Sequence, residues 1–65
     1  MIMDKKRFYI RHINEGILVK VTKMGQPIYD NNPFPHQYWL GTKSQAEKML
    51  ERLGHRLHDM GERIL

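Results

Sequence analysis

The sequence predicts an α+β fold, in which an antiparallel sheet of two to three strands packs on one long C-terminal amphipathic helix. Three observations predict this fold. Residues 7–23 are rich in aromatic and β-branched residues and contain one glycine turn, as in a hairpin. Prolines and glycines interrupt residues 24–35. From residue 42 onward the apolar positions repeat every 3.6 residues, which is the period of a helix.

The length and composition indicate one small domain, residues 1–65, with a thin core. The chain has no cysteine, so neither a disulfide nor a thiolate zinc site can stabilise it. Its longest uncharged apolar run, residues 16–19, is too short to span a bilayer. No apolar run typical of a secretory signal stands near the N-terminus. We therefore expect a cytoplasmic protein without a membrane partner.

Two strands are expected at residues 7–13 and 17–23, joined by the three residues Asn14, Glu15 and Gly16. Glycine at the last of these positions can adopt the positive φ that a bulged hairpin turn needs. Residues 24–35 form a long loop that has room for a short edge strand at residues 28–29. Residues 36–40 are expected to return to the sheet as a third strand.

A helix is expected at about residues 43–61. Thr42 or Ser44 can cap its start, with Gln45 or Glu47 completing a capping box. We expect Gly54 to weaken or bend this helix without ending it. Its apolar stripe comprises Ala46, Met49, Leu50, Leu53, Leu57, Met60 and Ile64.

Such a helix would be longer than the sheet and would leave its last apolar residues uncovered. A homodimer through Leu57, Met60 and Ile64 is one expectation. The alternative is that the proline-rich loop folds back over these side chains.

Strand alternation divides the hairpin into two faces, because successive side chains point to opposite sides of a sheet. The face expected to meet the helix carries Phe8, Ile10, Ile17, Val19 and Val21. The face expected to be exposed to solvent carries Arg7, Tyr9, Arg11, Leu18, Lys20 and Thr22.

The net charge of +4 comes entirely from the first third of the chain, because the charges of residues 25–65 cancel. A localised excess of positive charge attracts polyanions, although it also occurs on an ordinary soluble surface. Lysine and arginine can contact phosphates, and a tyrosine can pack on a base. The candidate nucleic-acid site comprises Arg7, Tyr9, Arg11, Lys20, Lys5 and Lys6.

A second candidate surface combines an aromatic loop with one charged side of the helix. Tryptophan, tyrosine and arginine are frequent binding anchors, and long loops in compact domains are often functional. The same aromatic residues can instead cover the core. The candidate protein-binding set comprises Phe34, Tyr38, Trp39, Lys48, Arg52 and Arg56.

No recognisable catalytic motif is present, and we expect no enzyme activity, cofactor or metal. His55 and His58 are three residues apart, whereas two helical metal ligands usually stand four apart. We expect both to be solvated helix histidines.

The residues 38–50 resemble the arm-type DNA-binding domain of phage and transposon integrases. In that family a three-stranded sheet is backed by one helix, and the last strand runs into a Thr-Lys-x-x-Ala-Glu helix start. Thr42, Lys43, Ala46 and Glu47 match that junction. The resemblance implies that the sheet docks into the DNA major groove through Arg7, Tyr9, Arg11 and Lys20.

The sequence therefore favours a small non-enzymatic nucleic-acid-binding protein, an accessory or regulatory factor of the kind that phages and mobile elements encode. The alternative is an inhibitor or adaptor that docks on a host protein through the aromatic-proline loop and the charged helix. Salt separates the two, because phosphate-driven binding weakens steeply as salt rises.

Overall fold

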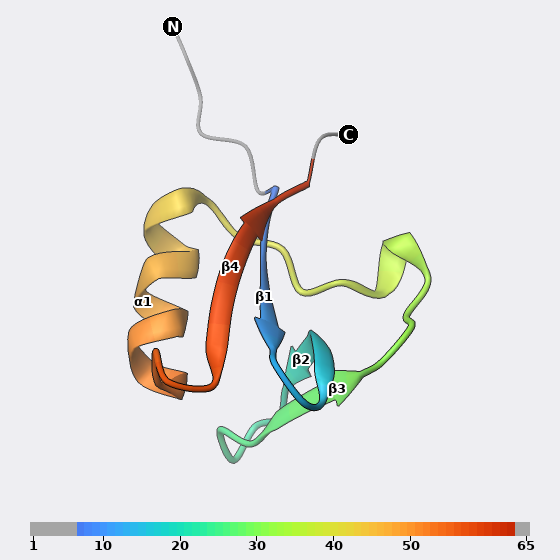
Figure 1. Ribbon diagram of the computed structural model, residues 1–65, viewed down its shortest axis with the longest axis horizontal. Helices are drawn as coiled ribbons and strands as arrows, with labels where there is room; N and C mark the ends of the chain where they lie inside the picture. The colour runs from blue at the N-terminus through green and yellow to red at the C-terminus, as the bar shows by residue number, and fades with distance from the viewer. Residues whose placement is uncertain (1–6, 64–65) are drawn as a thin grey trace, which may run out of the picture.

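The computed structural model describes residues 7–63, which form one four-stranded antiparallel sheet and one helix (Figure 1). The predicted α+β class is confirmed, with four strands in place of two or three. The strand order in the sheet is β3-β2-β1-β4. Along the chain the elements are β1 (Phe8–His12), β2 (Gly16–Val21), β3 (Pro27–Asp30), the 3-10 helix η1 (Pro35–Gln37), α1 (Lys43–Leu53) and β4 (His58–Glu62).

The predicted hairpin of β1 and β2 is present, with Arg11 opposite Ile17 and His12 opposite Gly16. Gly16 has a φ of 99°, in the region that favours glycine. A Cβ atom there would lie 2.4 Å from the carbonyl oxygen of Asp30. Only glycine therefore fits where the hairpin turn meets β3.

The predicted loop 24–35 contains strand β3, which pairs antiparallel with β2 at the edge of the sheet. Pro27 is its first residue, a position that tolerates proline because an edge strand has unpaired donors. The turn before it is closed by two hydrogen bonds, from Thr22 N to Gln26 O and from Gly25 N to Thr22 O.

The prediction of a third strand at residues 36–40 is wrong. Residues 35–37 form η1, because proline at the first position presets φ for a helical turn. The chain then meets the sheet at two points. Trp39 N donates to Leu18 O at 2.9 Å, and Gly41 exchanges two backbone hydrogen bonds with Phe8.

The start of α1 agrees with the predicted capping box. The Thr42 hydroxyl accepts from Gln45 N at 3.2 Å, and the Gln45 side-chain oxygen accepts from Thr42 N at 3.0 Å. Within residues 7–63 no helix is long and apolar enough to cross a membrane.

The prediction of a helix to residue 61 is wrong beyond Leu53. Gly54 has a φ of 106°, which no helical residue adopts, and its N–H donates to Leu50 O. Residues 58–62 then form β4, which pairs along all of β1, from Phe8 opposite Glu62 to His12 opposite His58. The backbone hydrogen bonds of a five-residue strand pairing stabilise this segment more than a continued helix would, because two glycines, Gly54 and Gly61, lower the stability of that helix.

This change removes the surface on which the homodimer was predicted. Met60 packs against the core from β4, and Leu57 lies in the turn between α1 and β4, 46% exposed. Ile64 lies outside the described residues. Self-association remains an untested prediction, but the extended helix on which the prediction rested is absent.

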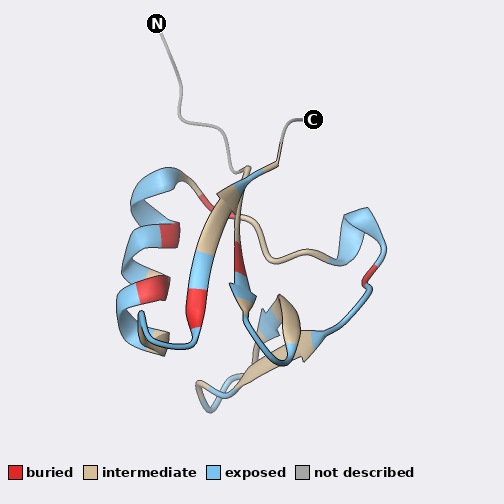
Figure 2. Cartoon of the chain, in the orientation of Figure 1, coloured by how far each residue is buried: buried red, intermediate tan, exposed pale blue. Residues whose placement is uncertain are grey.

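Four residues form the buried core between the sheet and α1: Ile10, Leu18, Ala46 and Leu50 (Figure 2). The predicted inward position of Ile10 is confirmed, whereas the outward position of Leu18 is wrong, since Leu18 is fully buried. The pairing of β2 with β3 is irregular between Leu18 and Lys20. This irregularity shifts the alternation by one residue, so that Val21 also packs on the core.

Candidate binding surfaces

The outer face of the sheet, which α1 does not cover, has an aromatic patch. The Tyr9 ring lies over Gly61, where a Cβ atom would be 2.6 Å from it. Tyr38 meets Tyr9 edge to face with ring centres 5.5 Å apart. The guanidinium carbon of Arg63 lies 4.9 Å from the centre of the Tyr38 ring. Tyr9 is therefore engaged within the molecule, and not free to stack as predicted.

Two cations of the predicted nucleic-acid site have carboxylate partners on β4. Arg7 Nε lies 2.6 Å from Glu62 Oε2, and Arg11 Nη2 donates to Asp59 Oδ2 at 2.7 Å. The hydrogen bond and charge of Asp59 raise the pKa of Arg11. Exposed ion pairs of this kind contribute little to stability, but they do cancel charge on this face.

The remaining residues of that predicted site are not gathered into one surface. Lys20 is exposed on β2, three residues beyond the Ile17 that pairs with Arg11. Lys5 and Lys6 lie outside the described residues. The carboxylates were not recognised as partners because Asp59 and Glu62 were expected on a helix.

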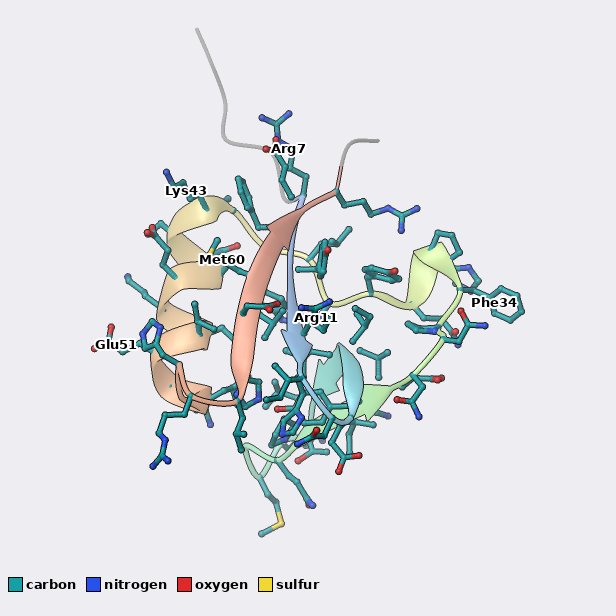
Figure 3. The ribbon with its side chains drawn as sticks, in the orientation of Figure 1. Arg7, Arg11, Phe34, Lys43, Glu51 and Met60 are labelled. Atoms are coloured by element: carbon teal, nitrogen blue, oxygen red, sulfur yellow. The ribbon has the colours of Figure 1, made fainter. Side chains whose placement is uncertain are left out.

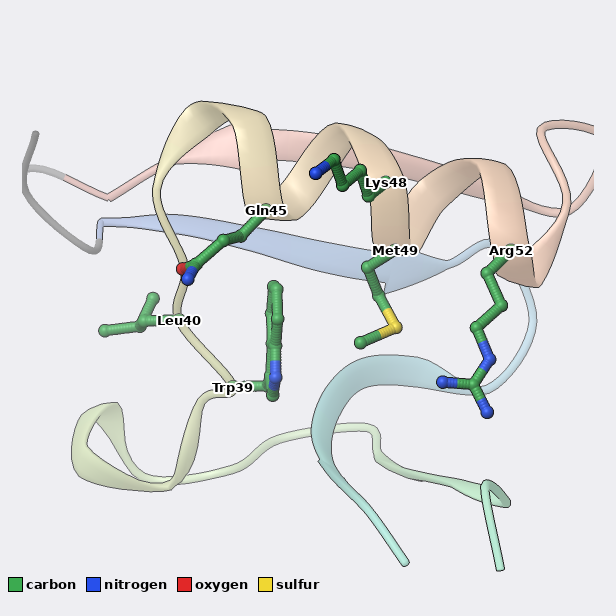
Figure 4. A pocket seen from close by; sticks show the side chains of 6 residues that line it. All are labelled: Trp39, Leu40, Gln45, Lys48, Met49 and Arg52. Carbon is green, nitrogen blue, oxygen red and sulfur yellow. The ribbon is translucent and has the colours of Figure 1, made fainter.

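A groove of about 410 Å³ lies between α1 and the chain that leads into it (Figure 4). Helix residues at spacings of three and four form one wall, because such residues share a helix face. Figure 4 shows Met49 pointing from α1 into the space beside the Trp39 ring, and Arg52 pointing toward β2 farther along the helix. The lining residues are Trp39, Leu40, Gln45, Lys48, Met49 and Arg52.

Backbone contacts fix the position of Trp39 at the groove. Its N–H is bonded to Leu18 O, and its ring lies so close to Gly41 that a Cβ there would be 2.8 Å from Cη2. The same added Cβ would be 3.1 Å from the Gln45 side chain. The absent side chain at Gly41 therefore lets the indole pack beside the start of α1.

Arg52 reaches from α1 to the turn between β2 and β3. A Cβ atom on Gly25 would lie 2.5 Å from Arg52 Nη2. Within residues 7–63, neither Arg52 nor Lys48 forms a salt bridge, and Glu51 on the same helix points away from the sheet (Figure 3). The groove thus combines apolar walls with two uncompensated cations.

The structure divides the predicted protein-binding set. It brings Trp39, Lys48 and Arg52 into the groove and places Tyr38 with Tyr9 on the outer face. Phe34 is 68% exposed and stacks on His36, far from α1 (Figure 3).

Arg56 is exposed in the turn after α1 and does not line the groove. Sequence reasoning missed Leu40 as a groove residue, because it was assigned to a third strand. It also missed Gln45 and Met49, because one was assigned to a cap and the other to the core. Their helical spacing from Arg52 and Lys48 was the available signal.

A histidine–tyrosine cluster joins β4 to β3 and to the end of α1. His58 Nδ1 lies 2.9 Å from Gly54 O, so this nitrogen carries the proton and donates it. In the neutral imidazole, His58 Nε2 is then the acceptor for the Tyr29 hydroxyl, 2.6 Å away. The His12 ring packs on both at centre distances of 4.8 and 5.2 Å. His58, expected to be a solvated helix residue, is instead a buried part of the fold.

Burial raises the pKa of Tyr29, and the negative charge of Glu15 adds to the shift. Both effects favour the neutral hydroxyl that His58 requires as a donor. Across residues 7–63, no group of three histidine or carboxylate side chains is arranged to hold a metal ion.

No family model, curated protein or solved structure matches this chain.

Proposed function

We propose that this chain is a small non-enzymatic binding protein, an adaptor or inhibitor that docks on an acidic segment of another protein. The docking site is the groove between α1 and Trp39. The observation that carries this proposal is a groove that a tryptophan lines together with two cations, Lys48 and Arg52, that have no salt-bridge partner among the described residues.

The chemistry of the groove favours a protein partner. Tryptophan and arginine contribute a large share of the energy at many protein interfaces, especially where an apolar pocket excludes water. Trp39, Leu40 and Met49 supply such apolar walls. Lys48 and Arg52 add positive charge at the rim, which selects and steers a negatively charged partner.

Nucleic-acid binding through the outer face remains the weaker proposal. Arg7 and Arg11 would have to exchange Glu62 and Asp59 for phosphates, and Tyr9 already packs on Gly61 and Tyr38. Among the cations predicted for that site that lie within residues 7–63, only Lys20 has no carboxylate partner. The outer face has less uncompensated charge to offer than the sequence predicted.

Affinity capture from host lysate, with and without nuclease treatment, tests the proposed function. The bait carries the wild-type sequence or the double reversal Lys48→Glu with Arg52→Glu. The control is Lys20→Glu with Lys43→Glu, which changes the net charge equally at two exposed positions outside the groove. Circular dichroism checks that all three fold alike.

We expect a protein to be retained by the wild-type and control baits and lost from the groove variant. The proposal is contradicted if all three baits retain the protein equally. It is also contradicted if only the groove variant retains it. Capture that disappears after nuclease treatment, or in the control variant, would instead support the nucleic-acid function.

A further inference from the structure

We infer that the free edge of β4 is a self-association site, where a second copy of this chain pairs its own β4 antiparallel and so continues the sheet. This inference goes beyond the proposed function and concerns a different surface from the groove. It is drawn from the backbone groups along β4, from the charges on this strand and from the position of α1.

The edge of β4 that faces away from β1 presents backbone groups without partners. Ile13 N donates to Leu57 O, so the odd-numbered residues of this strand bond to β1. The even-numbered residues therefore direct their N–H and C=O groups outward: His58, Met60 and Glu62. Within residues 7–63 these three form no other backbone hydrogen bond, and in Figure 1 no other helix or strand passes in front of β4. Such an edge is a template for a further strand.

β4 also lacks the features that usually block an exposed edge, which are lysine, proline, a bulge or free charges. It contains neither lysine nor proline, and its pairing with β1 is regular over all five residues. Its two carboxylates, on Asp59 and Glu62, already have arginine partners. The opposite edge strand, β3, has four residues and begins with Pro27, which has no N–H to donate. β4 is therefore the edge better suited to pairing.

Charge and length favour one register for this self-pairing. With Met60 opposite Met60 of the partner subunit, all five residues of each strand pair, and His58 lies opposite Glu62 of the partner subunit. Asp59 then lies opposite Gly61 of the partner subunit, so no like charges are directly opposed. An axis through Asp59 would set it opposite the partner's Asp59, which is destabilising. An axis through Gly61 would pair only residues 60–62 of the two strands.

The position of α1 is compatible with a two-fold axis at this edge. α1 contacts β1 and β4 alike, so the helix lies over the space between these two strands. Since neighbouring strands are about 4.8 Å apart, pairing through β4 would place the two α1 helices on one face, with axes about 10 Å apart. Packed helices lie about 8–10 Å apart, so the two would meet without a clash.

The dimer leaves the groove open in both copies. Trp39 at the groove is bonded to Leu18 of β2, and β2 lies on the opposite side of β1 from β4 (Figure 4). Both grooves open on the face that carries the helices. On the proposed function, a dimer can therefore hold two acidic segments of one partner at once, which raises the overall affinity.

Chemical synthesis of the 65-residue chain with a methyl group on the backbone nitrogen of Met60 tests the pairing. This methyl removes an outward donor and blocks the edge, while the hydrogen bonds between β4 and β1 stay in place. The matched control has the methyl on the nitrogen of Met24, which is 94% exposed in the turn between β2 and β3. Sedimentation equilibrium measures self-association, and circular dichroism compares the folds.

We expect the wild-type chain and the Met24 control to dimerise, and methylation at Met60 to raise the dissociation constant at least about tenfold, about 1.4 kcal/mol. A wild-type chain that is still monomeric at about 1 mM overturns the inference. Equal association of the two methylated chains overturns it as well. The variant Lys48→Glu with Arg52→Glu should dimerise like the wild type, so this test and the capture experiment can fail independently.

A disulfide tests the register without altering the backbone, since the chain has no cysteine of its own. In Met60→Cys the two Cα atoms would face each other about 5.5 Å apart, within the range of about 4.4–6.8 Å for a disulfide. In the control Glu62→Cys they would be about 13 Å apart along the strands, which is too far. We expect covalent dimers from Met60→Cys alone under mild oxidation. Linking of both variants, of neither, or of Glu62→Cys alone contradicts an axis through Met60.

Discussion

Single glycines decide where this chain can turn. Gly16, Gly25 and Gly54 all have positive φ: Gly16 begins β2, Gly25 lies in the turn between β2 and β3, and Gly54 caps the end of α1. Gly16 differs from Gly54 in its surroundings, because backbone atoms of Asp30 and Asn31 occupy the space of a Cβ atom at Gly16. Nothing lies within 4 Å of a Cβ atom at Gly54.

We predict that Gly16→Ala destabilises the fold by more than about 2 kcal/mol, since it combines backbone strain with a clash against β3. The matched change Gly54→Ala adds strain alone and should cost about 1 kcal/mol. Urea denaturation of both variants measures the difference. Equal losses would show that the contact of Gly16 with Asp30 does not matter.

At the residue scale the sequence predicts well wherever the signal is local. The Thr42 and Gln45 capping box depends on residues three positions apart, and it is present as predicted. The position of Leu18 was predicted wrongly, because strict alternation does not foresee an irregularity in the pairing of β2 with β3. That irregularity depends on the partner strand β3, of which the sequence indicated only a short edge strand at residues 28–29 within a long loop.

At the scale of elements, the major departure is β4. Its sequence has no β-branched residue and continues the apolar period of α1, so local pattern favours a helix. The pairing with β1 and the burial of His58 decide otherwise. Both are contacts between residues far apart in the chain, which periodicity cannot detect. The local sequence signal for the end of α1 was Gly54, because glycine readily adopts the backbone conformation that ends this helix.

The bond between Tyr29 and His58 links β3 to β4 across the sheet. We predict that Tyr29→Phe lowers the free energy of unfolding at pH 7 by about 1–2 kcal/mol, since His58 Nε2 loses its donor. The hydroxyl's pKa is raised above its ordinary value of 10.0, so its contribution is fully present below pH 10.

That contribution is lost as the pH rises above 10 through the raised pKa of Tyr29, because the unfolded tyrosine releases its proton first. The stability difference between wild type and Tyr29→Phe should therefore shrink in alkaline solution. Chemical denaturation at pH 7 and above pH 10 measures it. A difference that stays constant with pH would contradict a buried, neutral Tyr29.

At the scale of the whole molecule, the placement of β4 changes which surface can bind a partner. It brings Asp59 and Glu62 beside Arg11 and Arg7 and so cancels charge on the face that the sequence favoured. It also confines α1 to residues 43–53, with Lys48 and Arg52 at the groove.

Three of the six residues predicted for protein binding line the groove, namely Trp39, Lys48 and Arg52. The two on α1 could be grouped from helical spacing alone. Trp39 could not be placed beside them from the sequence, because its position depends on its bond to Leu18 and on the space at Gly41.

The central claim is that Lys48 and Arg52, which have no salt-bridge partner within residues 7–63, make the groove beside Trp39 attractive to anions. Collisional quenching of Trp39 fluorescence tests this directly. Iodide is an anion, so it should collect near Lys48 and Arg52 and quench Trp39 more strongly than caesium does. In the Lys48→Gln, Arg52→Gln variant the preference for iodide should fall sharply, while acrylamide quenching stays the same. Equal iodide quenching in wild type and variant would contradict the claim.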